Sequence, residues 1–391
     1  MVADRTLVTE LATALGTLPF ADLDVAIDAR SDVLRIDGPT WDHLRHLHTA
    51  GSYRPEFAAA YGNGRAFAAA TCGLGGRPPH LVEWTGGRRP GGDEVAPIDL
   101  RIDHVYLISC KYLSANVANP SPARLFDGLL ATTGPWGHGD WYAAVAPDAY
   151  QELYTACRDA TGLAGLPARA VELSSSDRER LRRALPGRLY PQAAREPYRR
   201  LCAEVSVRSA ERWRAALAAL DPERMLCRLL RIGSAPYFLL GAHGAESLRL
   251  RVDTPLDWHD RFRCTELTVA PAGAGQPRVD WRARYVTRGT GAHGQVDGHV
   301  EIRWSHGRFG QPPEAKVYLD TPVDRVPGYN PLEPPADAVG PLGQARFPLT
   351  AASRRAAVAQ PRGGGSGGQG AGGTPGRPRS GHRLVPPAAP T

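Results

Sequence analysis

Apolar and polar positions follow two different periods along this chain of 391 residues. Residues 6–18, 40–48 and 55–72 carry apolar side chains three or four positions apart, which predicts amphipathic helices. An Asn63-Gly64 pair predicts a break in the third of these helices. Residues 170–230 are also predicted to be mainly helical. The first half of the chain is therefore expected to contain several short helices.

A β-hairpin is predicted over residues 98–112, around which the rest of the chain is interpreted. Residues 98–102 alternate apolar and polar, residues 103–104 are a polar turn, and residues 105–108 are an apolar run. Antiparallel pairing about this turn would set Asp99 roughly opposite the end of that run, one step from Ser109. A strict two-residue turn would put Asp99 on the other face, so this arrangement needs one extra turn residue or a bulge.

Other segments fit short strands. Before and after the hairpin, residues 79–85 and 141–145 are predicted strands, and a helix, strand, strand, strand, helix, strand, helix order predicts an α/β module. Towards the C-terminus the period changes to two and Gly, Pro or Asp turns separate the segments. These later strand candidates are residues 237–240, 248–252, 264–269, 279–286, 299–304 and 315–319.

The composition is that of an ordinary water-soluble protein, with 42% apolar and 22% charged residues. A net charge of +7 favours an acidic partner, with nucleic acid ahead of membrane. No secretory signal and no apolar run long enough to cross a bilayer is visible. The six cysteines contain no CxxC pair, so free thiols and a cytoplasmic location are expected.

Lysine is scarce in this chain. Of the 47 basic residues only Lys111 and Lys316 are lysines, and arginine supplies every other positive side chain. Lys111 ends an apolar strand and lies two positions after Ser109, on the same face. A compact ammonium retained there suggests a chemical role. The alternative is a strand-end lysine with its stem on the core and its charge in water.

Two groups of polar residues have simpler explanations. His43 and His46 could share a helix face, but no acidic or cysteine partner follows at the right spacing, which favours a solvated face over a metal site. The arginines of residues 170–230 alternate with glutamates, which favours a salt-bridged surface over a phosphate-binding stripe. Arg, Trp and Tyr also alternate on several C-terminal strands, as on a nucleic-acid surface or a half-exposed antiparallel sheet.

Hydrolysis of a phosphodiester near neutral pH needs carboxylates that hold Mg²⁺, a metal-activated water and a cation. In Pro97-Ile98-Asp99 followed by Ser109-Cys110-Lys111, the chain resembles the PD-(D/E)XK nuclease superfamily, which includes many restriction endonucleases. The resemblance covers roughly residues 50–160. It implies an α/β (α+β) fold with a restriction-endonuclease-like αβββαβ core.

The resemblance also implies roles for single residues. Asp99 and a second acid would hold Mg²⁺, which Mn²⁺ could replace, and Lys111 would assist the attacking water. Ser109 stands where the family usually has Asp or Glu, and its hydroxyl could bind a metal-coordinated water. The second metal ligand is then expected elsewhere, with Glu83 on the adjacent strand first and Glu56 on the preceding helix second.

A rival site uses the other lysine. Asp297 with Glu314-Ala315-Lys316 matches the acid and acid-x-lysine pattern literally. Antiparallel pairing would place Asp297 and Glu314 at opposite strand ends, which argues against it. Cys110 beside Lys111 could be a nucleophile, but adjacent strand residues point to opposite faces, which favours a buried thiol. No Walker loop, dinucleotide-binding motif or GxSxG elbow lies in a fitting context.

Five regions are expected along the chain. Residues 1–50 form an N-terminal helical segment, residues 51–165 the nuclease-like core, and residues 166–230 an Arg-rich helical segment. Residues 231–330 form a β-rich module that could recognise DNA. Residues 355–391 form a basic tail of low complexity that is expected to be disordered.

Together these patterns predict a metal-dependent endodeoxyribonuclease of the restriction or defence type. Its partner would be double-stranded DNA, with no membrane contact, and a homodimer is one expected form. A non-catalytic DNA-binding or interaction protein with a decayed nuclease fold is the main alternative, because the triplet carboxylate is missing. An assembly protein that uses its arginine surface for a protein partner is a third interpretation.

Overall fold

The structure is a computed structural model of the chain. It describes residues 3–86, 98–112, 116–131, 139–186, 189–243, 246–273 and 275–333, and of residues 111, 112, 242, 243 and 246 the backbone only. Every described residue belongs to the first of the chain's two units, Met1–Gly340. The predicted basic tail over residues 355–391 therefore lies outside the described residues.

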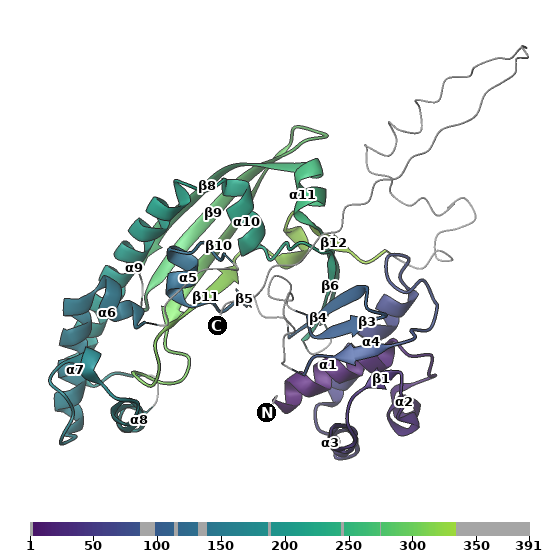
Figure 1. Cartoon of the computed structure of the whole chain (residues 1–391), viewed down its shortest axis with the longest axis horizontal. Helices are drawn as coiled ribbons and strands as arrows, with labels where there is room; N and C mark the ends of the chain where they lie inside the picture. The colour runs from purple at the N-terminus through teal and green to yellow at the C-terminus, as the bar shows by residue number, and fades with distance from the viewer. Residues whose placement is uncertain are drawn as a thin grey trace, which may run out of the picture. The chain divides into compact units, whose positions relative to one another are not determined.

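The described residues form α-helices and two β-sheets, in agreement with the expected α+β class (Figure 1). The first sheet is 7-stranded, with the order β1-β2-β3-β4-β6-β7-β12. Its neighbouring strands are antiparallel except for the β1–β2 and β4–β6 pairs, which are parallel. The strands are β1 (Leu34–Arg35), β2 (Val82–Trp84), β3 (Leu100–Ile102), β4 (Tyr106–Tyr112), β6 (Tyr237–His243), β7 (Glu246–Val252) and β12 (Tyr329–Pro331).

The second sheet is 5-stranded and antiparallel throughout, with the order β5-β11-β10-β9-β8. Its strands alternate buried, mostly apolar residues with partly exposed polar ones, as their period of two predicts. They are β5 (Asn116–Ala118), β8 (Phe262–Ala272), β9 (Arg278–Thr287), β10 (His293–Arg303) and β11 (Glu314–Leu319).

The helices lie between these strands in the chain. Those before the hairpin are α1 (Asp4–Gly16), α2 (Leu23–Ala29), α3 (Gly38–Thr49) and α4 (Arg54–Ala69). Those between the hairpin and β6 are α5 (Pro122–Phe126), α6 (Trp141–Val145), α7 (Pro147–Thr161), α8 (Ser175–Ala184), α9 (Arg195–Leu217) and α10 (Pro222–Leu229). α11 (Pro255–Arg261) precedes β8, and short 3₁₀ turns are Ala170–Glu172, Gln192–Ala194 and Val323–Arg325.

Helices α1 and α4 pack on one face of the first sheet, where a buried cluster joins them to β3, β4 and β6. The two helices cross closely because small residues meet. A Cβ built on Gly64 would lie 2.1 Å from the Thr13 carbonyl oxygen and 2.8 Å from the Gly16 Cα. Only glycine leaves room for backbone to approach backbone at this distance.

The predicted break at Asn63-Gly64 was wrong, because α4 continues through both residues. Asn63 is 1% exposed and donates its Nδ2 to the Gly241 carbonyl of β6 at 2.7 Å. Its Oδ1 accepts a hydrogen bond from Arg249 Nε of β7 at 2.9 Å. The Asn63 side chain, which the sequence suggested would break the helix, instead forms hydrogen bonds that connect the helix to two strands.

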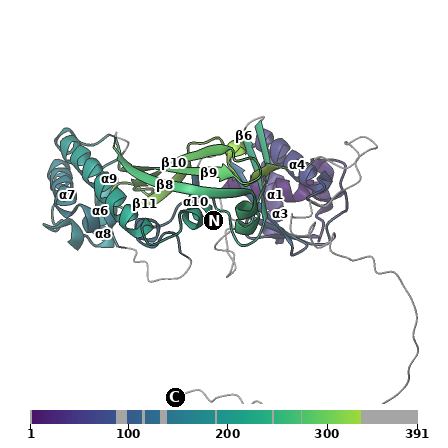
Figure 2. The same ribbon diagram turned by 90° about the horizontal axis from the view of Figure 1, so that it is seen from above.

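The second sheet is covered by the long helix α9, which lies along β8 in both views (Figure 1, Figure 2). Trp213 of α9 and Trp281 of β9 are both almost fully buried in this layer. The core here also includes Phe126 of α5, whose ring centroid is 5.4 Å from that of Trp213. Burial of such large aromatic side chains is a main source of the layer's stability.

The strand predicted at residues 141–145 was also wrong, because this segment is helix α6. Its buried residues, Trp141, Tyr142 and Val145, have helical spacing. Asp140 caps the helix by accepting a hydrogen bond from the Tyr142 N–H at 3.1 Å. The parallel neighbour of β4 is instead β6, whose sequence lies in the range predicted as the β-rich module.

No helix among the described residues is long and apolar enough to cross a membrane.

Candidate active site

Asp99 and Ser109 lie side by side at the open end of the β3–β4 hairpin. Leu100 pairs with Ile108, and the connecting loop has three residues rather than two, 103–105. This is the extra turn residue that the sequence interpretation required. Asp99 Oδ2 accepts hydrogen bonds from the Cys110 N–H at 2.7 Å and from Ser109 Oγ at 3.3 Å. A carboxylate is thus held at a fixed place on a rigid strand pair.

Lys111 is described through its backbone only. It pairs with Gly241 in the parallel β4–β6 ladder. Its position is two residues after Ser109 on the same strand, so the backbone places both positions on the same face of the sheet. Pro97, the first residue of the family-like motif, lies outside the described residues.

Glu83 lies on the same sheet face as Asp99 but is turned towards the hairpin loop. Glu83 pairs directly with Arg101, and Asp99 lies two residues before Arg101 on β3's chain. Glu83 and Asp99 are therefore diagonal neighbours on the same face. Glu83 Oε2 lies 3.2 Å from Nδ1 of His104. That oxygen is shielded from solvent and, within the described residues, accepts no hydrogen bond of good geometry. Glu83 therefore has a carboxylate oxygen that a further cationic partner could satisfy.

Glu56 does not join this group. It lies in the first turn of α4, the helix that packs on the opposite face of the sheet from Ser109. Its carboxylate binds Arg5 of α1, with 2.5 Å between Arg5 Nη2 and Glu56 Oε1. This contact links the N-terminal ends of the two helices. The structure thus brings Asp99, Ser109 and Glu83 to one face and leaves Glu56 on the other.

Asp103, in the hairpin loop, anchors the chain that leads into β2. Its carboxylate accepts hydrogen bonds from the main-chain N–H groups of His80 and Leu81 at 2.8 and 3.0 Å. It also binds Arg77 at 2.6 Å. Burial alone would raise the pKa of Asp103, but the hydrogen bonds from Arg77 and these two N–H groups lower it. Its role is therefore to fix the loop.

The rival residues are separated as antiparallel pairing predicts. Glu314 pairs with Arg303 at one end of the β10–β11 ladder, and Asp297 lies beyond its other end. Asp297 binds Arg282 at 2.7 Å. Lys316 Nζ lies 3.8 Å from its own neighbour, Glu314 Oε2. These three residues do not form one site.

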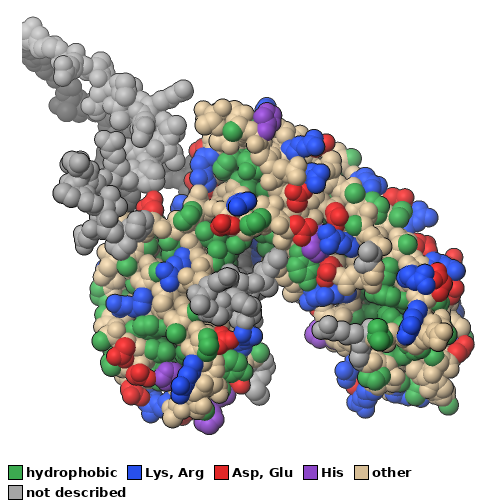
Figure 3. Space-filling view, turned by 180° about the vertical axis from the view of Figure 1, so that it is seen from behind, with side chains coloured by type: hydrophobic (Ala, Val, Ile, Leu, Met, Phe, Trp, Pro, Cys, Tyr) green, Lys and Arg blue, Asp and Glu red, His purple; other side chains and the backbone are tan. Residues whose placement is uncertain are grey.

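The arginines of α8 and α9 are largely paired with acids. In Figure 3, basic and acidic side chains are interspersed over the visible surface. This pairing favours a salt-bridged surface over a continuous phosphate-binding stripe. The pairs are Arg180 with Asp177, Arg182 and Arg183 with Glu179, Arg199 with Glu196, Arg200 with Glu152, Arg208 with Glu211, and Arg212 with Asp127.

The polar face of the second sheet is likewise internally neutralised. Both cross-strand and same-strand ion pairs occur on it, and His299 stacks on Tyr318 with ring centroids 4.8 Å apart. This arrangement fits a half-exposed antiparallel sheet better than a cationic surface. The pairs are Arg278 with Asp280, Arg282 with Asp297, Arg284 with Glu266, and Arg303 with Glu301.

The histidines and cysteines form no metal centre in the part of the chain that the structure describes. No group of three or more His, Cys, Asp and Glu side chains there could hold a metal ion. His43 binds Asp4 at 2.8 Å on the exposed side of α3. The cysteines are free, and burial raises the pKa of the Cys157 thiol to about 12. Cys110 packs on the opposite face from Ser109, as expected, but it is only partly buried.

Sequence reasoning missed the residues that hold the site in place. Thr85 donates its main-chain N–H to the Asp99 carbonyl at 3.0 Å, which extends the β2–β3 ladder by one step. His104 pairs with Glu83, and it is the middle residue of the three-residue turn 103–105. The alternation of residues 82–85 with 99–102 could have indicated Thr85, whereas nothing in the sequence indicated the His104 contact.

Comparison with known proteins adds no relative. No protein-family model, no curated protein and no solved structure matches the chain significantly.

Proposed function

We propose that the chain is a metal-dependent endodeoxyribonuclease whose site lies at the open end of the β3–β4 hairpin. The observation that carries the proposal is the contact between Asp99 and Ser109, with the position of Lys111 next on the same strand. An acid on one strand and a polar-x-lysine triplet on its antiparallel neighbour form the pattern of the PD-(D/E)XK nucleases. Lysine is otherwise nearly absent from the chain.

The strand order supports the same proposal. A helix, α4, precedes three antiparallel strands, β2, β3 and β4, and a fourth strand, β6, joins parallel to β4. This is the order expected of an αβββαβ core. The chain between β4 and β6, residues 113–236, holds β5 and helices α5 to α10. In this proposal it takes the place of the single crossover helix of a minimal core.

The donors at the site suit a hard cation. Asp99 and Glu83 offer carboxylate oxygens on one sheet face, and Glu83 Oε2 has no hydrogen bond within the described residues. Mg²⁺ is commonly bound by one or two carboxylates together with water. When bound there, it would polarise the phosphate and lower the pKa of a coordinated water. For Glu83 to contribute, its side chain must exchange His104 for the metal.

The protein residues would then have separate tasks. Ser109 is fully buried and donates its hydroxyl to Asp99, so we assign it to orienting that carboxylate. Cys110 N–H fixes the same oxygen from the main chain. Lys111 would stabilise the attacking water and the negative charge that develops on the phosphate.

Duplex DNA is the proposed substrate, and the C-terminal segment is the proposed source of its phosphate contacts. Residues 334–391 contain seven arginines and one aspartate, so they carry +6 of the chain's net charge of +7. Residues 1–333 therefore carry only +1. Because the arginines of α8 and α9 are largely paired, the C-terminal segment offers the most unbalanced positive charge for a polyanion.

Plasmid cleavage tests the proposal. Supercoiled plasmid is incubated with the full chain and Mg²⁺ or Mn²⁺, with EDTA as the control. We expect metal-dependent cutting that Lys111→Ala and Asp99→Asn abolish and that Lys316→Ala retains. Lys316→Ala is a matched control, because it removes the chain's other lysine. Loss of cutting in Lys316→Ala but not in Lys111→Ala would move the site to the second sheet.

The competing function is DNA binding without cleavage. It is favoured by Ser109, which is neutral where the nuclease pattern has an acid. A folded chain that binds duplex DNA but cuts no unmodified, methylated or phage DNA with either metal would establish this alternative and overturn the nuclease proposal.

A further inference from the structure

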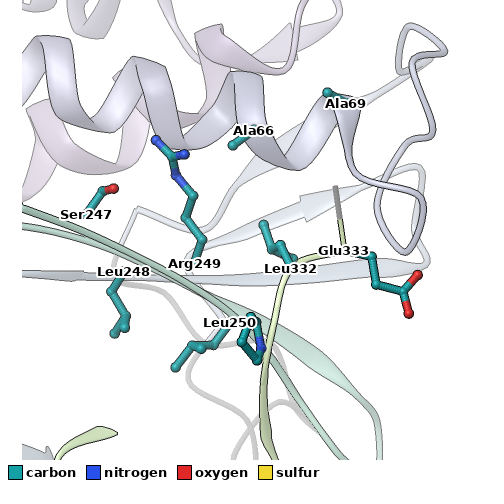
Figure 4. A pocket seen from close by; sticks show the side chains of 9 residues that line it. Ala66, Ala69, Ser247, Leu248, Arg249, Leu250, Leu332 and Glu333 are labelled. Carbon is teal, nitrogen blue, oxygen red and sulfur yellow. The ribbon is translucent and has the colours of Figure 1, made fainter. Parts of the chain in front are cut away.

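A groove lies beside the outer edge of β7, at the far side of the first sheet from β1 (Figure 4). Its volume is about 560 Å³. Helix α4 forms one wall through Ala66 and Ala69, whose small side chains leave the space open. Leu332 and Glu333, which follow β12, form the other wall. β7 lies at its base.

The edge of β7 is only partly covered by the chain's own β12. β12 pairs with Leu250, Arg251 and Val252, and Leu332 donates its N–H to the Arg249 carbonyl at 3.1 Å. Because outward-facing groups alternate along an antiparallel strand, Ser247 directs its N–H and C=O to the same side as Arg249. Within the described residues β12 and the residue after it reach only as far as Arg249, and no main-chain hydrogen bond from outside the strand ladders reaches Ser247.

The sequence after Glu333 limits which hydrogen bonds the chain could offer to β7. Pro334 and Pro335 follow Glu333 directly. Proline has no N–H, so neither residue could donate to the Ser247 carbonyl. An open strand edge with unpaired main-chain groups is the feature to which an extended peptide adds as a further strand.

Arg249 supplies the positive charge on the β7 side of the groove, and Glu333 lies in the opposite wall. Its Nε donates to Asn63 Oδ1 at 2.9 Å, which fixes the side chain against α4. Its Nη2 lies beside Gly62, 3.7 Å from where a Cβ would be. Figure 4 shows the guanidinium on the groove side of β7, while Leu248 points to the other side. No acid pairs with this guanidinium within the described residues, and Glu333 accepts a hydrogen bond from Thr71 at 2.9 Å instead.

We propose that this groove binds an extended segment of a partner protein that carries an aspartate or glutamate. Its main chain pairs with Ser247 on the edge of β7, and its acidic side chain binds the Nη groups of Arg249. The small residues of α4 leave room for the alternate side chains of the segment. This binding site is separate from the hairpin site, and it does not depend on nuclease activity.

Fluorescence anisotropy with two labelled peptides tests the proposal, using the full chain. The probes are fluorescein-labelled Thr-Val-Asp-Val-Thr and its counterpart with Lys in place of Asp. We expect the acidic peptide to bind at least about tenfold more tightly than the lysine peptide. Equal binding of the two, tighter binding of the lysine peptide, or no binding of either at about 1 mM would overturn the proposal.

Two substitutions at Ser247 separate main-chain pairing from loss of folding. Ser247→Pro removes the outward N–H, a change that edge strands tolerate, whereas Ser247→Ala keeps it. We expect Ser247→Pro to weaken binding of the acidic peptide at least about tenfold and Ser247→Ala to leave it unchanged. Equal thermal unfolding midpoints show that both variants are folded. Wild-type binding by a folded Ser247→Pro variant would contradict the proposed pairing.

Discussion

The Asn63 side chain of α4 donates a hydrogen bond to the Gly241 carbonyl of β6 over a distance of 2.7 Å. The same amide accepts a hydrogen bond from Arg249 of β7. One buried side chain therefore joins a helix to two adjacent strands. Gly241 is also the residue with which Lys111 pairs, so this contact supports the strand end at which the proposed site lies.

Asn63→Ala should destabilise the protein by about 1–3 kcal/mol, because it removes one hydrogen bond to the buried Gly241 carbonyl and the acceptor of Arg249 Nε. Chemical unfolding in urea measures the change. Gln295→Ala is the control, since this exposed side chain on β10 bonds only Asp297 among the described residues, and its effect should stay within about 0.5 kcal/mol. A free energy of unfolding for Asn63→Ala equal to that of the wild type would contradict the assigned role.

Gly64→Ala should be strongly destabilising and Gly62→Ala should not, although both lie in α4. The Gly64 Cβ would meet the Thr13 carbonyl oxygen at 2.1 Å, and relief requires movement of α1, at a cost of about 1–3 kcal/mol. The Gly62 Cβ would meet only Arg249 Nη2, at 3.7 Å. Gly62→Ala should therefore stabilise the helix by about 0.5–1 kcal/mol. Thermal unfolding midpoints that shift in the same direction for both variants would contradict this packing.

The stabilisation that Asp103 supplies should depend on pH. Its folded pKa is lower than the ordinary value of 3.8, so the carboxylate stabilises the fold above that value. This stabilisation disappears as the pH falls through the lowered folded pKa. Asp103→Asn should therefore be destabilised by about 1–3 kcal/mol at pH 7, and the difference from the wild type should shrink below about pH 4. Urea unfolding between pH 3 and 7 measures it, and a difference independent of pH would contradict it.

Ser109→Ala should slow the proposed cleavage without stopping it. The variant loses the hydroxyl contact to Asp99 but keeps the Cys110 N–H contact at 2.7 Å. Looser placement of the carboxylate should lower kcat on the order of tenfold with KM nearly unchanged. Steady-state plasmid cleavage separates the two constants. A variant with wild-type kcat would show that Ser109 does not orient Asp99 during the reaction.

Replacing the seven arginines of residues 334–391 by serine should reduce both DNA affinity and its salt dependence. Each phosphate contact contributes a slope of about 0.9 to the plot of log affinity against log salt concentration. A matched control replaces Arg182, Arg199 and Arg208, which are paired on α8 and α9. Anisotropy of a labelled DNA duplex measures both sets. If the salt-dependence slope falls more in the control variant than in the tail variant, the phosphate contacts lie on α8 and α9.

Single helices and strands could be predicted where apolar residues recurred at one regular spacing along the whole element. The hairpin and β9, β10 and β11 were predicted from alternation alone, because an exposed face on one side makes the pattern visible. The strand prediction for residues 141–145 failed because five mostly apolar residues fit a strand and a helix equally well. The Asp140 cap and Pro147 were the available signals for a helix.

The arrangement in space could be predicted less well. The hairpin prediction placed Asp99 beside Ser109 only on the assumption of one extra turn residue, which the three-residue loop supplies. Glu83 and its contact with His104 depend on rotamers that no spacing rule specifies. The pairing of β4 with β6 joins residues far apart in the sequence, and no local pattern encodes which distant strand becomes the neighbour.

The pairing of β4 with β6 has a consequence during synthesis on the ribosome. β4 emerges long before β6, because all of residues 113–236 are made between them. Until then β4 has an uncovered edge beside buried apolar residues such as Ile108. An unpaired strand edge of this kind pairs readily with other chains. Newly made chains should therefore pass through an aggregation-prone stage that ends only when Tyr237–His243 reaches the sheet.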